Sequence, residues 1–137
     1  MEVHEDIIAQ ALNFIFGGLE TSTTVMTFIA YELALNENIQ KRLQQEIDDT
    51  LFDCRGKLTY EALQSMKYMD MVVSEALRKW PHGLLIDRTC VKDYIVKPVN
   101  LTEKELLIEK GTTIHIPVVG IHRDPKYYPN PDASGFG

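Results

Sequence analysis

The longest hydrophobic segment of the chain covers residues 7–29, and it has apolar residues on nearly every side of a helix. This pattern predicts a buried helix, which we place at about residues 6–35. A helix of this kind needs neighbours all round, yet the rest of the chain offers two more long helices and a little sheet. We therefore expect the chain to be part of a larger protein, because the apolar surface of this helix would otherwise stay partly exposed to solvent.

The centre of this segment breaks the apolar pattern. Gly17 and Gly18 each cost about 1 kcal/mol relative to alanine in a helix interior. Glu20 follows, and then four hydroxyl residues at positions 21–24. Two interpretations are open. The hydroxyls can bond back to carbonyls one turn earlier and kink the helix. Alternatively, the glycines open a groove for a flat or diatomic ligand, with Glu20 and Thr21 supplying a proton path.

A second helix is predicted after Asn36, which reads as a stop for the first helix and a possible N-cap for the next. It should end near Phe52. Apolar residues recur there at every fourth position, which indicates an amphipathic surface helix: Ile39, Leu43, Ile47 and Leu51.

Two more helices follow a polar loop. Thr59 can cap a short helix at residues 60–65. The clearest helical periodicity in the chain then predicts a helix at about residues 67–79, and Pro81 terminates it.

After Pro81 the pattern changes to short strands, at residues 84–86 and 89–96. Residues 106–108 and 112–116 read as a β-hairpin, in which Gly111 can supply a positive φ. One helical turn at residues 118–122 and an irregular but defined loop follow. The fold class is therefore mainly α with a small β-sheet (α+β), with one domain over residues 1–137.

Composition narrows the function classes. The chain is 45% apolar and 25% charged, as expected for a globular domain, and its net charge of −6 argues against nucleic acid as a partner. Cys54 and Cys90 lack disulfide or metal-site spacing, so we expect reduced thiols and no metal site of that kind. Residues 7–29 are long enough to span a bilayer, but their polar residues favour the core helix of a soluble domain.

Five later residues are candidates either for chemistry or for structural contacts. Glu75 and Arg78 have the spacing of a surface ion pair, although they flank the apolar stripe and could be partly buried. Arg88 could be solvated or paired with an aspartate, or it could hold a cofactor carboxylate. His122, like His115, is expected to be a hydrogen-bonded structural histidine.

Together these residues resemble the cytochrome P450 family, the haem-thiolate monooxygenases. The resemblance rests on an ordered set: Gly17-Gly18-x-Glu20-Thr21-Ser22, then Glu75-x-x-Arg78, Trp80-Pro81, Arg88, Asp93 and finally His122-Arg123-Asp124-Pro125-x-x-Tyr128-x-x-Pro131. Residues 67–75 and Lys79-Trp80-Pro81 look most like the microsomal, xenobiotic-metabolising members of insects. The resemblance covers nearly the whole chain, but only a central-to-late portion of a full-length member.

The resemblance implies roles for the oxygen-side helix. Glu20 and Thr21 match the acid–alcohol pair that delivers protons to dioxygen at the haem. Gly17 and Gly18 match the small residues that leave room for it, so that they and Thr21 border the cofactor. Arg88 matches the residue that pairs with a haem propionate.

It also implies a structural network, a substrate class and partners. Glu75 and Arg78 match the core salt bridge of the family. Substrate-facing positions are matched by Phe16, Gly83, Leu84 and Leu85, which implies an apolar small-molecule substrate. The implied reaction inserts one oxygen atom into that molecule, with electrons from an NADPH-dependent reductase. A full-length member would lie at the cytosolic face of the endoplasmic reticulum membrane.

The sequence departs from the family pattern after Asp132. Family members continue to a Gly-rich loop with the cysteine that ligates iron, and neither Cys54 nor Cys90 lies in a matching loop. We therefore expect a fragment without the axial cysteine that is inactive alone. The alternative is a non-catalytic helical module without haem, whose apolar helix binds a partner chain. Supplying the missing sequence would discriminate between the two.

Overall fold

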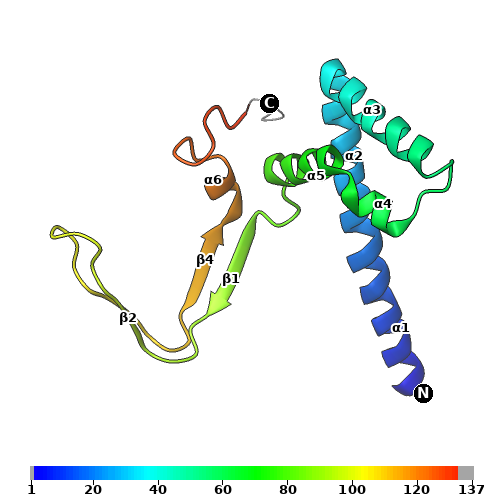
Figure 1. Cartoon of the computed structure of the whole chain (residues 1–137). Helices are drawn as coiled ribbons and strands as arrows, with labels where there is room; N and C mark the ends of the chain where they lie inside the picture. Colours follow the sequence, from blue (N-terminus) through cyan, green and yellow to red (C-terminus); the bar gives the residue numbers. More distant parts are fainter. Residues whose placement is uncertain (1, 133–137) are drawn as a thin grey trace.

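A helical rod dominates the computed structural model, which describes residues 2–132. The rod consists of α1 (Glu2–Ile15), η1 (Phe16–Glu20) and α2 (Thr21–Leu35), joined without a break (Figure 1). Its end at Leu35 confirms the predicted end. The predicted start near Asp6 is wrong, because no glycine or proline interrupts the preceding residues and the helix begins at Glu2. The expected departure from the family pattern falls on residues 133–137, which lie outside the described residues.

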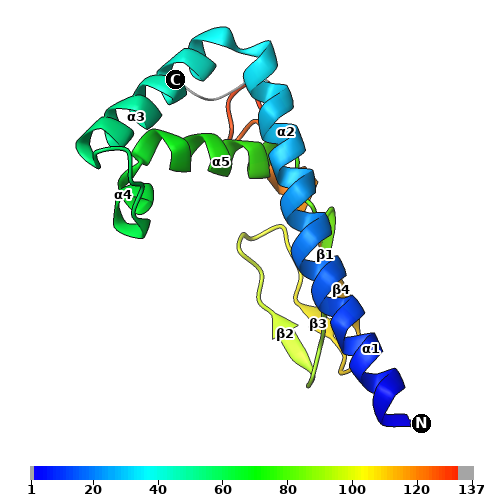
Figure 2. The ribbon, with the colours of Figure 1, turned by 90° about the vertical axis from the view of Figure 1, so that its right-hand side faces the viewer.

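Three helices lie on one side of α2: α3 (Glu37–Asp53), α4 (Tyr60–Ser65) and α5 (Lys67–Lys79) (Figure 2). Of these, α3 and α5 pack against α2. Helix α5 crosses α2, and α3 turns back from the top of the rod (Figures 1 and 2). The core lies where these helices meet and consists of Leu43, Tyr68 and Val72, with partly buried neighbours Ile29, Leu33, Ile39, Ile47 and Met69. The predicted bounds of the helices at residues 60–65 and 67–79, here α4 and α5, are confirmed.

Side chains fix the ends of these helices. Thr59 Oγ1 accepts the Ala62 N–H (3.2 Å), which confirms the predicted cap. Asn36 stops α2 as predicted, but its side chain donates to the Glu32 carbonyl (2.8 Å) and makes no cap bond to α3. The Glu46 carboxylate of α3 accepts hydrogen bonds from two backbone N–H groups in the first turn of α5, those of Tyr68 and Met69, each at 2.8 Å. This carboxylate joins α3 to α5 and satisfies N–H groups that a helix start leaves unpaired.

The prediction that the first helix is buried all round is not confirmed for this chain. Its apolar residues are mostly exposed along α1 and η1: Ile7, Ile8, Leu12, Phe14, Ile15, Phe16 and Leu19. Only α2 has helical neighbours, and α1 extends past them (Figure 1). The expectation that the remaining elements cannot enclose this helix is therefore confirmed. Within residues 2–132, no helix is long and apolar enough to cross a membrane.

The strands form a two-stranded ribbon, which corrects the predicted hairpin. Strand β1 (Leu85–Thr89) pairs antiparallel with β4 (Thr113–Pro117), and β2 (Tyr94–Val96) pairs antiparallel with β3 (Leu106–Ile108). Both ladders keep one register, so the chain reverses in the loop at residues 97–105 and not at Gly111.

Contacts across the ribbon explain the difference. Gly111 does adopt a positive φ of 90°, but its N–H donates to the Cys90 carbonyl (2.7 Å) on the other strand. The neighbouring Lys110 N–H donates to Asp93 Oδ1 (2.8 Å). These contacts make Gly111 part of an interruption between the two ladders. The same interruption divides the strand predicted at residues 89–96.

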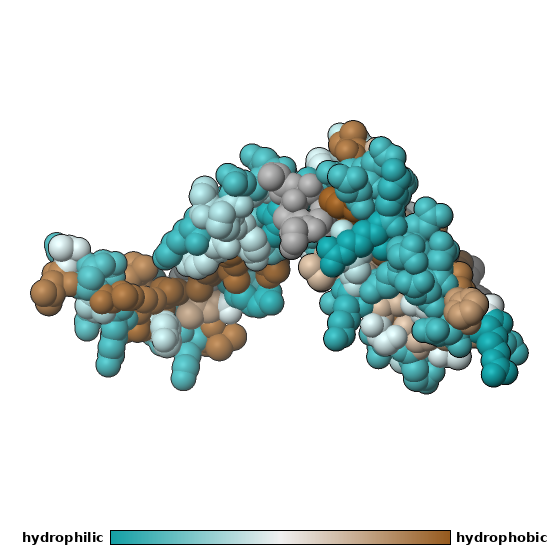
Figure 3. All heavy atoms as spheres, turned by 45° about the horizontal axis from the view of Figure 1, so that its top comes forward, coloured by the Kyte–Doolittle hydropathy of each residue, from teal (hydrophilic) through white to brown (hydrophobic). Residues whose placement is uncertain are grey.

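The ribbon stands away from the lower part of the rod, and its outer end carries an apolar surface (Figures 1 and 3). Exposed residues of this end include Val99, Leu101, Leu106 and Leu107. Helix α6 (Val118–His122) follows Pro117 as predicted and returns the chain to the end of α5. Residues 123–132 then form turns without a regular element, as expected.

Candidate active site

The rod changes its helical geometry at the glycine pair. Residues Phe16–Glu20 form a π-helix, while Ile15 and Thr21 on either side have ordinary helical dihedral angles. A π-turn shifts the backbone bonds by one residue, and such turns are frequent at functional sites. Thr21 Oγ1 donates to the Gly17 carbonyl at 2.6 Å. The Thr21 hydroxyl thus bonds back to a carbonyl of the preceding turn, as the first interpretation predicts. The helix is also distorted at the glycine pair, as expected if this segment forms a ligand groove.

Further hydroxyls bond in the same way. Thr23 Oγ1 approaches the Leu19 carbonyl at 2.8 Å and the Glu20 carbonyl at 3.1 Å, and Thr27 Oγ1 donates to the Thr23 carbonyl at 2.8 Å. These bonds satisfy hydroxyls on a helix that is otherwise apolar. Bonds of this kind to carbonyls of the preceding turn slightly destabilise and often bend a helix.

The surface around the glycine pair is open. A Cβ atom added to Gly17 or Gly18 would meet nothing within 4 Å. A neighbouring hollow of about 450 Å³ is lined by Ile15, Phe16, Leu19, Glu20 and Thr23. Thr21 does not line it, so the predicted acid and alcohol border different parts of the helix surface. An outside group can approach the backbone here without displacing a side chain.

Glu75 and Arg78 form a two-bond ion pair near the end of α5. Arg78 Nε and Nη2 donate to the two carboxylate oxygens at 2.6 and 2.7 Å. Their side chains are 14% and 9% exposed, so the pair is largely buried and the surface-pair interpretation is wrong. The reason is that α6 and the following loop cover it.

The rest of the Arg78 guanidinium holds that covering segment. Nη1 donates to the His122 carbonyl (2.8 Å) and Nη2 to the Pro131 carbonyl (2.9 Å). The Tyr128 ring lies 5.0 Å away, and His122 Nδ1 bonds the Arg78 carbonyl (3.2 Å), as expected of a structural histidine. The hydrogen bond that Arg78 donates to Glu75 is the main reason why the pKa of Arg78 is raised, although burial opposes it. Arg78 therefore stays charged.

The remaining predicted residues lie on the ribbon side. Arg88 is exposed on β1, and its Nη1 donates to the Asp87 carbonyl at 2.6 Å. Leu84 lines a hollow of about 450 Å³ together with Phe28 and Trp80, while Gly83 and Leu85 are exposed beside it. Phe16 borders the other hollow, together with Leu19 and Glu20, so Phe16 and Leu84 line different hollows of the structure.

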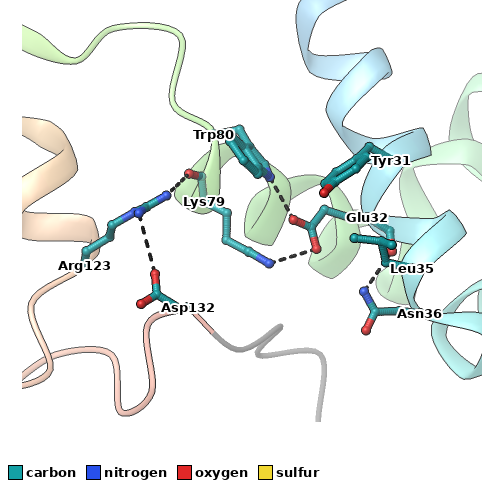
Figure 4. A pocket seen from close by; sticks show the side chains of 8 residues that line it. All are labelled: Tyr31, Glu32, Leu35, Asn36, Lys79, Trp80, Arg123 and Asp132. Atoms are coloured by element: carbon teal, nitrogen blue, oxygen red, sulfur yellow. Dashed lines mark hydrogen bonds and ion pairs between the residues drawn. The ribbon is translucent and has the colours of Figure 1, made fainter.

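A polar junction between α2 and α5 was missed in the sequence. Glu32 of α2 is buried, and it binds Lys79 and Trp80 at the end of α5 (Figure 4). The signal was available, since Glu32 is a carboxylate inside an apolar helix, as Glu20 is. The junction borders a hollow of about 460 Å³ whose other side carries Arg123 and Asp132.

Comparison with known proteins decides the family. The sequence profile of the family Cytochrome P450 matches residues 3–133. The chain belongs to the cytochrome P450 family. It is 48% identical over 128 residues to cytochrome P450 9e2 of Blattella germanica, a match that covers 93% of this chain and 23% of that protein.

Two other P450 relatives come from an insect and a mammal. Probable cytochrome P450 9f2 of Drosophila melanogaster is 46% identical over 92% of this chain and 24% of its own length. Cytochrome P450 3A19 of Capra hircus aegagrus is 42% identical over 94% of this chain and 56% of its own length. The chain thus spans about a quarter of the insect relatives that it matches.

The P450 family implies haem, and the described side chains fit part of this group. The open backbone at Gly17 and Gly18 suits the face of a flat macrocycle, and the exposed guanidinium of Arg88 suits a carboxylate at its edge. The thiol of Cys90 donates to the Lys92 carbonyl at 2.9 Å, and Cys54 lies just after α3. Among residues 2–132 we assign no axial ligand, and no cluster of three or more His, Cys, Asp or Glu could hold a metal ion.

Proposed function

We propose that this chain supplies the oxygen-side part of the active site of a haem-dependent monooxygenase. The enzyme inserts one oxygen atom of O₂ into an apolar organic molecule and reduces the other to water, with electrons from an NADPH-dependent reductase. The observation that carries this proposal is the π-turn at Gly17 and Gly18, with Glu20 and the Thr21 hydroxyl beside it, in a chain of the P450 family.

Gly17, Gly18 and Thr21 would border the haem face, and Arg88 would hold a propionate. When bound, the haem would supply the activation of dioxygen for transfer to the substrate. The glycines serve by their size, because a side chain there would occupy the space that a small ligand needs.

Thr21 Oγ1 is the atom that we propose to pass a proton toward the oxygen. In the structure this hydroxyl donates to the Gly17 carbonyl, so its lone pairs can accept a second proton donor. Glu20 is exposed, so its carboxylate can exchange protons with water. Glu20 and water would restore the proton that Thr21 gives up, and a positioned acid–base group of this kind contributes about 10²–10⁴-fold to rate.

The proposed substrate is apolar because the surface near Glu20 is apolar. Phe16 is 62% exposed and borders the hollow with Ile15 and Leu19. Leu84 and Leu85 offer exposed apolar side chains on the ribbon side. We propose that these surfaces face the substrate in the whole enzyme, which would work at the endoplasmic reticulum membrane as inferred for its family.

The test places residues 2–132 into cytochrome P450 9e2 of Blattella germanica in place of the aligned segment. The chimaera is loaded with haem, reduced and exposed to CO, and then supplied with reductase, NADPH and an apolar substrate that the parent enzyme is first shown to oxidise. We expect the thiolate-type CO spectrum and product formation at the level of the parent enzyme. Loss of both, in a chimaera that folds with the helical content of its parent, would contradict the proposal.

The exposed apolar surface of α1 favours a second function, a helical module without haem that binds a partner chain. The same chimaera discriminates between the two. A chimaera that folds but takes up no haem favours the module.

A further inference from the structure

Glu32 is a buried carboxylate that the proposed chemistry does not use. It lies on α2 and is 4% exposed. Its Oε2 accepts a bond from Lys79 Nζ at 2.8 Å, and its Oε1 accepts the indole N–H of Trp80 at 2.8 Å (Figure 4). A buried carboxylate is costly unless it is paired, and here each oxygen has its own donor from the end of α5.

Aromatic contacts of Trp80 also hold the end of α5 against α2. The Trp80 ring stacks on Phe28 with centroids 4.5 Å apart and planes at 4°, and Tyr31 meets its edge at 6.2 Å. Phe28 and Glu32 are four residues apart, so they share one face of α2. The polar and aromatic contacts together fix how α2 is rotated about its axis.

That rotation extends to the proposed catalytic threonine. Residues Thr21–Leu35 form one regular α-helix, which begins where the π-turn ends. Thr21 lies eleven residues before Glu32, which is about three turns and 16 Å along the helix, on nearly the same face. A regular helix is stiff over this length, so a rotation set at Glu32 is passed to the Thr21 hydroxyl.

The end of α5 therefore holds two different parts of the molecule. Arg78 holds the loop that contains Pro131, while the next two residues, Lys79 and Trp80, hold α2. Each attachment involves a carboxylate, the largely buried Glu75 for the first and the buried Glu32 for the second.

We propose that Glu32 is a positioning residue, which locks the oxygen-side helix to the end of α5 and so sets where the Thr21 hydroxyl lies relative to the haem. The part that concerns the haem rests on the proposed function. The part that concerns the junction does not.

The first experiment tests the junction in the 137-residue chain. Trp80 is its single tryptophan, so its fluorescence during urea unfolding reports on this site. We expect Glu32→Gln and Lys79→Gln each to lower the unfolding midpoint, and the double variant to lose less than the sum of the two. Additive losses, or a wild-type emission equal to that in concentrated urea, would overturn the junction.

A matched control uses an exposed ion pair. Glu37 and Lys41 approach at 2.6 Å, but their side chains are 74% and 68% exposed. We expect Glu37→Gln to leave the midpoint and the Trp80 emission unchanged, because exposed pairs contribute little. A loss as large as that of Glu32→Gln would show a general charge effect and contradict the proposal.

The second experiment tests positioning in the haem-loaded chimaera. We expect Glu32→Gln to keep the CO spectrum but to release about two- to tenfold more peroxide per NADPH consumed. Lys79→Arg keeps the cation and should keep the coupling. Unchanged coupling in Glu32→Gln, with a lowered unfolding midpoint, would reduce Glu32 to a structural residue.

Failure of the proposed function is distinguishable from failure of this inference. If the unsubstituted chimaera forms no CO complex, the monooxygenase proposal fails and positioning toward a haem fails with it. The urea experiment on the 137-residue chain still decides whether Glu32 fixes α2 to α5.

Discussion

Two polar regions interrupt the apolar pattern of this chain, and they differ in how far the chain itself satisfies them. Around Arg78, one guanidinium binds one carboxylate and two backbone carbonyls, and the ion pair is largely buried. Around Gly17 and Glu20 the helix is distorted, the surface is open and the carboxylate is exposed.

The difference separates architecture from chemistry. A region whose donors and acceptors are paired within the chain can hold helices and loops in place. A region with an open backbone, a distorted helix and an exposed acid can receive a group from outside. We therefore propose that the Arg78 region supports the fold and that the Gly17–Glu20 region takes part in the proposed reaction.

Disrupting the Arg78 region should lower the free energy of unfolding more than any other change proposed here. Arg78→Ala leaves the Glu75 carboxylate without its cation in a largely buried place. We expect a loss of about 3–5 kcal/mol in the free energy of unfolding, measured by urea denaturation with Trp80 fluorescence. Glu37→Ala removes an exposed pair and should cost at most about 1 kcal/mol. Equal losses of stability for the two variants would contradict a supporting role of the Arg78 region.

The cap on α5 should have the next largest effect. Glu46→Ala removes the acceptor for the backbone N–H groups of Tyr68 and Met69. Since both amides lie at the start of α5, we expect a loss of about 1–2 kcal/mol by the same measurement. Gln45→Ala on the exposed side of α3 is the control and should change little. No loss for Glu46→Ala would mean that α5 starts without this carboxylate.

In the Gly17–Glu20 region, by contrast, a substitution should raise the stability of the chain. Gly17→Ala adds a methyl group that meets nothing within 4 Å, so we expect the 137-residue chain to gain about 1 kcal/mol. In the haem-loaded chimaera the same methyl group should weaken CO binding, because it occupies the space of the ligand. A destabilised chain would show that the space is not open.

Alkaline pH should have the smallest effect. The hydrogen bond that Arg78 donates to Glu75 raises the pKa of Arg78 in the folded chain. The stability linked to a raised pKa is fully present below the unfolded pKa and is lost only as pH rises through the folded one. The stability difference between wild type and Arg78→Ala should therefore stay constant from pH 7 to about 10. A decline over that range would contradict the charged pair.

Local patterns predicted the helices well. The apolar periodicity and Pro81 placed α5, and Thr59 placed the start of α4, because periodicity and caps are local signals. The pairing of the strands was mispredicted, since Gly111 permits a hairpin turn and the sequence does not reveal that its N–H binds Cys90 on another strand.

The sites show the same division. Gly17, Glu20 and Thr21 were visible as violations of a local pattern. Glu32 was visible in the same way, as a carboxylate inside an apolar helix, but its partners were not. The burial of Arg78 and the partners of Glu32 depend on segments more than 40 residues away, such as those of His122 and Trp80.

The proton path from Thr21 is the central claim, and the coupling of electron consumption to product formation tests it most directly. In the haem-loaded chimaera, Thr21→Ala and Thr21→Ser are compared for peroxide released per NADPH consumed. We expect Thr21→Ala to release peroxide in place of product and Thr21→Ser, which keeps the hydroxyl, to stay close to wild type. Unchanged coupling in Thr21→Ala would contradict the assignment.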